Sequence, residues 1–295
     1  MNQFEEFEFL DSSGNKTKHN CDKSKLANLH GANPNAPQFL TPVFFDKEVL
    51  DRYYNKPSEY SIQDGALFFG IKWMVRLDNN SRDCITVYLG DLGDLPHKEQ
   101  LHWKFHNITQ GSLSNVSLKR DFMAEFTPAQ EPSLVFKQKL NNFNKKWNEK
   151  FEWDLFKPLN NEDEHHLKSL KIPKNEQKEF DEIILSLNKI IIDSLNVAEM
   201  KKHLDSKEEE KSISVLERYL KQKYRLSNIE MFNFLRSLQI LRSRGSAHRK
   251  GSDYHEIYKK FDEGDFSKTF EKILIKSIWI LNTLENKILE SGNGK

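Results

Sequence analysis

An arginine and a histidine separated by five residues are the side chains in this sequence best suited to chemistry. Arg242 and His248 lie in the run Arg-Ser-Arg-Gly-Ser-Ala-His-Arg-Lys-Gly, residues 242–251. Metal-free RNA cleavage needs one group that moves a proton at the 2′-hydroxyl or the 5′-oxygen, and another that holds the phosphate. Histidine titrates near neutral pH, and the planar guanidinium of arginine matches phosphate oxygens. The two side chains together therefore supply the chemistry that such a reaction requires.

The charge around this pair supports the interpretation, because the spacing alone is not specific. The same spacing recurs at Arg249 and His255. Between residues 218 and 250, however, nine Lys or Arg side chains accompany a single acidic residue, Glu230. Such a concentration of positive charge in a chain of net charge +1 is the footprint expected of a phosphate-backbone site.

Small residues follow Arg242 and favour a cleft at this point over a simple helix end. Cations at a helix C-terminus complement the helix dipole, and that alone would account for Arg242 and Arg244. It gives no reason for the turn-permitting Gly245 and Ser246. We therefore expect the polar side chains around the pair to bind substrate, namely Ser243, Arg244, Ser246, Arg249 and Lys250.

No metal or cofactor is expected. The acidic residues are dispersed, and the two cysteines, Cys21 and Cys84, make neither a disulfide framework nor a CxxC pair. Residues 89–96, Leu-Gly-Asp-Leu-Gly-Asp-Leu-Pro, lack the spacing of a phosphate-binding glycine loop, and their two aspartates would repel phosphate. They are predicted to form a strand-to-helix turn.

The elements that must position the Arg242 segment are helices. From residue 173 onward apolar residues recur with the period of an amphipathic helix, first at Phe180, Ile183, Ile184 and Leu187 and on to Leu195. Ser214-x-x-Glu217 and Ser227-x-x-Glu230 resemble capping boxes that open two further helices. We predict a bundle of four or five helices over residues 173–295.

Residues 39–172 are predicted to form a mixed α/β domain with connecting helices. A helix is expected at 46–54 and another after Pro96, with strands at 67–77 and 84–89 joined by a turn at 78–82. The aromatic residues between 122 and 156 are expected to pack in a core, and the charged run 162–166 to be solvated. Residues 1–38, rich in turn formers, are predicted to be a flexible tail, so the fold class is α+β.

Composition agrees with a folded, soluble protein. The chain has 295 residues, 37% of them hydrophobic and 30% charged, which is enough apolar side chain for a core. The acidic start is not a signal peptide, and no uncharged apolar run approaches the roughly 20 residues of a membrane helix. A cytoplasmic protein without a membrane partner is the expectation.

The segment from Leu241 to Gly251, placed after a helix of a predicted bundle, resembles the Arg-x(4–6)-His signature of HEPN domains. Residues 40–289 also look like the C-terminal half of longer uncharacterised bacterial HEPN-like proteins. That likeness is carried by Leu40-Thr-Pro-Val-Phe-Phe, Leu89-Gly-Asp-Leu-Gly and the Ala-His-Arg-Lys-Gly run. Ser243 stands where the family often has Asn, Asp or His.

The resemblance implies a function and a set of roles. HEPN domains occur in toxins, abortive-infection proteins and antiphage effectors, and active members pair as dimers that bring two Arg…His motifs into one metal-independent RNase site. By this likeness His248 would be the catalytic group, Arg242 the phosphate binder, RNA the substrate and a homodimer the active form. If the protein is such a nuclease, residues 39–172 would sense a signal, inhibit the nuclease or place its substrate, with a regulatory protein or a nucleotide as a possible trigger.

Two functions from different classes remain open at this point. The first is a metal-independent endoribonuclease of the HEPN type, acting as a toxin or an antiphage defence effector. The second is a non-catalytic HEPN-like module that binds RNA, a nucleotide or an acidic partner through the basic segment. Some members of the family are inactive, so turnover of RNA separates the two.

Overall fold

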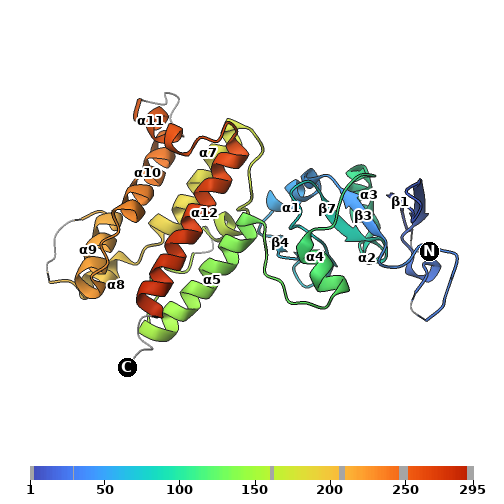
Figure 1. The fold of residues 1–295 in the computed structure, drawn as a ribbon, viewed down its shortest axis with the longest axis horizontal. Helices are drawn as coiled ribbons and strands as arrows, with labels where there is room; N and C mark the ends of the chain where they lie inside the picture. The colour runs from blue at the N-terminus through green and yellow to red at the C-terminus, as the bar shows by residue number, and fades with distance from the viewer. Residues whose placement is uncertain (1–2, 29, 160–162, 206–209, 246–251, 291–295) are drawn as a thin grey trace. The chain divides into compact units, whose positions relative to one another are not determined.

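The computed structural model describes residues 3–28, 30–159, 163–205, 210–245 and 252–290, without the side chains of 243–245 and 252–253. Contacts along the chain divide it into two units, Met1–Glu131 and Pro132–Lys295, which Figure 1 draws as ribbons. The first unit holds small antiparallel sheets and short helices, and the second is helical. The predicted α+β class is therefore confirmed.

The first unit begins with a hairpin where a flexible tail was expected. Strands β1 (Glu6–Leu10) and β2 (Lys16–Asn20) pair antiparallel. In β1 the alternation of glutamate and phenylalanine points Phe7 and Phe9 into the core, with 0% and 3% of their surface exposed. Gly14, at φ +80°, provides the left-handed residue of the connecting turn. The structure thus differs from the expected tail because two buried phenylalanines hold the hairpin in place.

Two three-stranded antiparallel sheets complete the β structure described in this unit. One has the order β7-β3-β8 and the other β4-β5-β6. Their strands are β3 (Pro42–Phe45), β4 (Tyr60–Gln63), β5 (Ala66–Phe69), β6 (Trp73–Arg76), β7 (Ile85–Tyr88) and β8 (Asn107–Ile108).

The single strand predicted over residues 67–77 is two strands. Gly70 adopts φ +50° and Ile71 is fully exposed, so the chain turns there and β6 folds back on β5. The hairpin turn expected at 78–82 is instead a loop with bends at 82 and 83, and a single antiparallel bridge joins Asp78 to Thr86 across it. Beyond that bridge β7 pairs with β3, a partner far away in the sequence.

Short helices connect these strands and cover the core. The helix expected at 46–54 is confirmed as two successive turns, and the helix after Pro96 is α3. The strand-to-helix turn expected at 89–96 is confirmed where α2 follows β7 directly. The helical segments are η1 (Lys23–Lys25), η2 (Lys47–Leu50), α1 (Asp51–Tyr54), α2 (Leu89–Leu92), α3 (His97–Phe105), α4 (Asn115–Ser117) and the π-helical η3 (Leu118–Phe122).

The second unit is a bundle in which α5, α7, α10 and α12 run side by side (Figure 1). Its helices are α5 (Pro132–Phe151), α6 (Glu164–Lys168), α7 (Gln177–Asn188), η4 (Lys189–Asp193), α8 (Val197–Lys202), α9 (Ser212–Tyr224), α10 (Ile229–Gly245), α11 (Ser252–Phe261), α12 (Phe266–Leu284) and η5 (Glu285–Leu289). The apolar stripe predicted from Phe180 to Leu195 is buried as expected.

The boundary between the units lies earlier than predicted. The predicted boundary lay between residues 172 and 173, so α5 was expected to be a connecting helix before the bundle. The structure places α5 within the bundle, which begins at Pro132. Phe136, Phe143 and Trp147 on α5 are fully buried in the helical core, as the expectation of aromatic packing required. These aromatic side chains make α5 part of the bundle.

Helix starts also differ from the predicted capping boxes. Ser214 lies inside α9, which begins at Ser212. At the start of α10 the side chain of Asn228, rather than Ser227, accepts a hydrogen bond from the Met231 N–H at 3.1 Å. Asparagine and serine are similarly favoured at the N-cap, so local sequence alone could not distinguish Ser227 from Asn228 as the cap.

Candidate functional site

Arg242 is the predicted catalytic residue whose side chain the structure describes, and it lies in the last turn of α10. Ser243 and Arg244 continue the same helix, but their side chains lie outside the described residues. Ser246, His248, Arg249 and Lys250 all fall in the segment 246–251, which is also outside them. The expected approach of His248 to Arg242 therefore stays a prediction.

The guanidinium of Arg242 is held by a carboxylate from a neighbouring helix. Its Nη1 donates to both carboxylate oxygens of Asp193 at 2.7 Å. Asp193 ends η4, the continuation of α7, and α10 packs along α7. The side chains are 27% and 34% exposed, and an ion pair as solvated as this contributes only about 0–1 kcal/mol. A phosphate could therefore replace Asp193 at small cost.

Asp193 also belongs to a row of alternating charges. Nζ of Lys189 lies 3.9 Å from the Asp193 carboxylate and 3.5 Å from that of Asp163. Asp163 precedes α6, and Lys189 begins η4. We name these four residues, together with His166 and Ser186 below, the Arg242 cluster. Its two anions keep two cations in place on one side of α7.

His166 adds an imidazole to this cluster. Its Nδ1 lies 3.0 Å from the hydroxyl oxygen of Ser186, and its Nε2 lies 3.8 Å from Asp163. The side chain is 13% exposed. Burial, which disfavours the imidazolium, lowers the pKa of His166, and the neighbouring His165, Lys189 and Arg242 lower it further against the attraction of Asp163. At neutral pH the ring is therefore uncharged.

Hydrogen bonding at Ser186 indicates which nitrogen of His166 carries the proton. The Ser186 hydroxyl lies 3.1 Å from the carbonyl oxygen of Glu182 and can donate its single hydrogen there. Nδ1 of His166 must then be the donor to the Ser186 oxygen, which leaves the lone pair on Nε2. In that tautomer His166 is a neutral base within the same cluster as Arg242.

Carboxylates from outside residues 218–250 neutralise part of the positive charge that this segment carries in the sequence. Arg218 donates to the Glu210 carboxylate at 3.0 and 2.7 Å, and Arg236 pairs with Glu217. With Asp193 on Arg242, three of the counted cations have carboxylate partners. All three partners lie outside residues 218–250, so a count confined to that segment missed them. A phosphate surface here would depend on the remaining cations and on the replacement of Asp193 by phosphate at Arg242.

Sequence reasoning missed His166, which was assigned to a solvated charged run. It is covered because α6 packs on α7, a contact that local sequence does not encode. One signal was present: Ser186, Lys189 and Asp193 recur at helical spacing as a polar stripe beside the apolar stripe of α7. Such a polar stripe beside a buried apolar face predicts that polar side chains of neighbouring segments contact the helix there.

Comparison with known proteins leaves the site to be interpreted on its geometry. No family model, curated protein or solved structure matches this chain. Among the described residues, no group of three or more His, Cys, Asp or Glu is placed to hold a metal ion. In the same part of the chain no helix is long and apolar enough to cross a bilayer.

Proposed function

We propose that this protein is a metal-independent endoribonuclease of the HEPN type that acts in the cytoplasm as a toxin or antiphage defence effector. The observation that carries the proposal is Arg242, held at the end of α10 by an ion pair with Asp193 that a phosphate can replace, six positions before His248 in the chain. RNA cleavage requires a group that binds phosphate and a group that moves a proton. Arg242 can supply the first once phosphate replaces Asp193, and His248 can supply the second.

In the proposed reaction the phosphoryl group is transferred from the 5′-oxygen of the next nucleotide to the 2′-oxygen of the ribose that carries it. The 2′-hydroxyl gives up its proton as its oxygen attacks phosphorus, and the 5′-oxygen leaves and takes up a proton, giving a 2′,3′-cyclic phosphate and a free 5′-hydroxyl. His248 moves a proton at one of these oxygens, and Arg242 neutralises the charge that develops on the phosphoryl oxygens. Ser243, Arg244, Ser246, Arg249 and Lys250 would bind the flanking RNA, and a second copy of the chain would complete a homodimeric site.

Cleavage of bulk RNA in EDTA by wild type and by His248→Ala tests this function. We expect wild type to cut and the variant to lose at least about 100-fold in rate, because a positioned acid or base contributes about 10²–10⁴. His255→Ala is the matched control. His255 is exposed on α11 and forms the second Arg…His spacing with Arg249, so its loss should leave cleavage intact. Unchanged cleavage by His248→Ala, with fold and mass preserved, would sink the proposal.

The second candidate is a non-catalytic module that binds RNA, a nucleotide or an acidic partner. It needs only the cations of the basic segment and makes no use of His248, whose approach to Arg242 stays a prediction. This alternative expects binding that weakens with salt and with Arg242→Ala or Arg249→Ala, and no RNA turnover by wild type. Turnover in EDTA that depends on His248 excludes it.

A further inference from the structure

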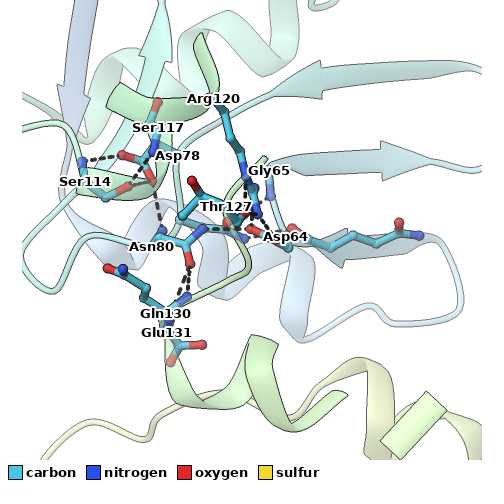
Figure 2. Close-up of polar contacts among 12 residues, drawn as sticks. Asp64, Gly65, Asp78, Asn80, Ser114, Ser117, Arg120, Thr127, Gln130 and Glu131 are labelled. Atoms are coloured by element: carbon cyan, nitrogen blue, oxygen red, sulfur yellow. Dashed lines mark hydrogen bonds and ion pairs between the residues drawn. The ribbon is translucent and has the colours of Figure 1, made fainter. Parts of the chain in front are cut away.

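Polar side chains that are withdrawn from solvent in the first unit pair with one another, as Figure 2 shows. Arg120 donates to Asp64 through Nη1 at 3.0 Å and Nη2 at 2.7 Å. Asn80 donates from Nδ2 to the same carboxylate at 2.7 Å and accepts at Oδ1 from the backbone N–H of Gln130 at 2.8 Å. Both the donors and the acceptor of Asn80 are used, and these contacts explain why its amide can be buried.

Asn188, the last residue of α7 in the second unit, is a buried amide in a different setting. It is 0% exposed, and its neighbours Leu187 and Ile190 belong to the hydrophobic core. Its Nδ2 donates to the carbonyl of Ile184 on its own helix at 2.9 Å and to that of Leu238 on α10 at 3.1 Å. Its Oδ1 is also buried and has no hydrogen-bond partner among the described residues. The amide therefore joins two packed helices while its acceptor is unused.

Stability does not explain an amide at this position. A buried polar atom without a partner costs free energy, and an apolar side chain of similar shape would avoid that cost. Neither carbonyl depends on Asn188, because each carbonyl inside an α-helix already accepts from the backbone N–H four residues later. A buried polar group between two helices can instead select one register of packing between them.

The register that Asn188 selects concerns the turn of α10 that carries Arg242. Leu238 lies one helical turn before Arg242, and its carbonyl is the one to which the Arg242 backbone N–H donates in the helix. Asp193, which holds the Arg242 guanidinium at 2.7 Å, follows Asn188 by five residues. The contact of Asn188 with Leu238 and that of Asp193 with Arg242 therefore succeed each other along one helix interface.

The π-helical η4 lets Asn188 and Asp193 face α10 together. In a regular α-helix a residue five positions later is rotated by about 140° beyond a full turn, so Asp193 would lie on a different side of the helix from Asn188. The hydrogen bonds of a π-helix join residues five apart, and η4 (Lys189–Asp193) begins directly after Asn188. Asp193 thus returns to about the side on which Asn188 lies. Such π turns are frequent at functional sites.

From these contacts we propose that Asn188 is a positioning residue, which fixes the register of α10 on α7 so that Arg242 meets Asp193 at the place where a phosphate can replace that carboxylate. Its effect on RNA cleavage rests on the proposed function, whereas its effect on the position of Arg242 concerns only α7 and α10. Asn188 touches no substrate in this role. It acts through its hydrogen bond to the Leu238 carbonyl.

The side-chain NMR signals of Arg242 test the geometry independently of catalysis. Its Nε and Cζ signals are assigned by their loss in Arg242→Lys, and Asp193→Asn shows their positions without the carboxylate. We expect Asn188→Leu to shift the Arg242 signals towards those of Asp193→Asn. The melting temperature of Asn188→Leu should equal or exceed that of wild type, because a buried unpaired oxygen has been removed.

Ile184→Val is the matched control, since Ile184 is 1% exposed and lies one turn before Asn188 on α7. It should lower the melting temperature by a few degrees and leave the Arg242 signals unchanged. Asn188→Ala removes the amide without adding bulk and should give the same signal shift as Asn188→Leu if the leucine prevents folding. Unchanged Arg242 signals in the folded Asn188 variant overturn the proposal.

Cleavage of RNA in EDTA tests the consequence for the proposed reaction. We expect Asn188→Leu to cut at least about tenfold more slowly, because a misplacement of about 1 Å can cost about 10²-fold in rate. In an Arg242→Ala background the same substitution should cause no further loss, because Asn188 acts only through Arg242. Additive losses would indicate a general structural role and contradict the assignment. If wild type does not cut, the proposed ribonuclease fails, and the NMR signals still decide whether Asn188 positions Arg242.

Discussion

His166 lies against α7 with 13% of its side chain exposed and its ring 3.0 Å from Ser186. Burial is the main cause of its lowered pKa; the nearby cations Lys189 and Arg242 add to it, and Asp163 opposes it. Burial and these cations act in the same direction, so the folded protein disfavours the protonated ring. His166, which was predicted from the sequence to be solvated, is therefore a neutral imidazole in the same cluster as Arg242.

The lowered pKa of His166 predicts how stability changes with pH. Between the folded pKa and the unfolded value of about 6.5, the unfolded chain binds the extra proton. The free energy of unfolding should therefore fall as pH decreases below about 6.5, and this contribution should end once the folded ring is protonated as well. In His166→Gln, urea unfolding from pH 7.5 to 5 should show a smaller decrease than in wild type.

His255→Gln on the exposed surface of α11 is the control for that measurement and should follow wild type at every pH. A decrease of equal size in wild type and His166→Gln would show that other groups carry the acid sensitivity. Cleavage assays on His166→Gln belong to the same experiment. A loss of activity there would extend the candidate site from His248 to the Arg242 cluster.

At the scale of elements, α5 and the end of α12 are joined through one buried carboxylate. Glu285, at the start of η5, is 4% exposed and is contacted by Lys139 and Lys146 of α5. Burial alone would raise the pKa of Glu285, but hydrogen bonds from the two lysines outweigh it and lower the pKa. Lys150, one turn further along α5, donates to the Ile288 and Leu289 carbonyls at 2.6 and 2.9 Å and caps η5.

Glu285→Gln should lower the free energy of unfolding of the helical unit by about 1–3 kcal/mol, because it leaves two lysines without their carboxylate. Urea denaturation at pH 7 followed by circular dichroism measures the change. Since the folded pKa is lowered, the stabilisation is present above the unfolded pKa and is lost as pH falls, so wild type and variant should converge in acid. Glu149→Gln, an exposed partner of Lys145 on α5, should change stability by less than about 0.5 kcal/mol. A loss in Glu285→Gln no larger than in this control would contradict the argument.

Helices were more predictable than strands because their signal is local. The apolar stripe of α7 repeats over several turns, so periodicity alone located it. Strand β7 instead finds its partner β3 some forty positions away, and no local pattern specifies that pairing. The hairpin of β1 and β2 had a local signal, the alternation Glu6-Phe7-Glu8-Phe9, which turn-forming neighbours hid. The contacts of Arg76 and the Tyr88 hydroxyl with Asp121 could not be expected from sequence, because β6, β7 and η3 meet only in the fold.

On the scale of the whole molecule, each unit has its own hydrophobic core. One cluster of buried residues runs from Phe7 to Trp103, and the other from Phe136 to Ile288. No residue of either cluster falls in the other unit, as far as the structure describes the chain. A domain that has its own hydrophobic core can in principle fold without the rest of the chain. The candidate chemistry at Arg242 lies in the second unit.

The fragment of residues 132–295 should therefore fold without the first unit. It begins with Pro132 at the first position of α5, where proline is well tolerated, and it keeps the contacts of Glu285 with Lys139 and Lys146. We expect a helical circular dichroism spectrum and a cooperative thermal transition, with Glu285→Gln melting several degrees lower. A fragment starting at residue 173, the boundary that periodicity predicted, lacks α5 with Phe136, Phe143 and Trp147 and should melt without cooperativity. Equal behaviour of the two fragments would show that α5 is not part of the folding unit.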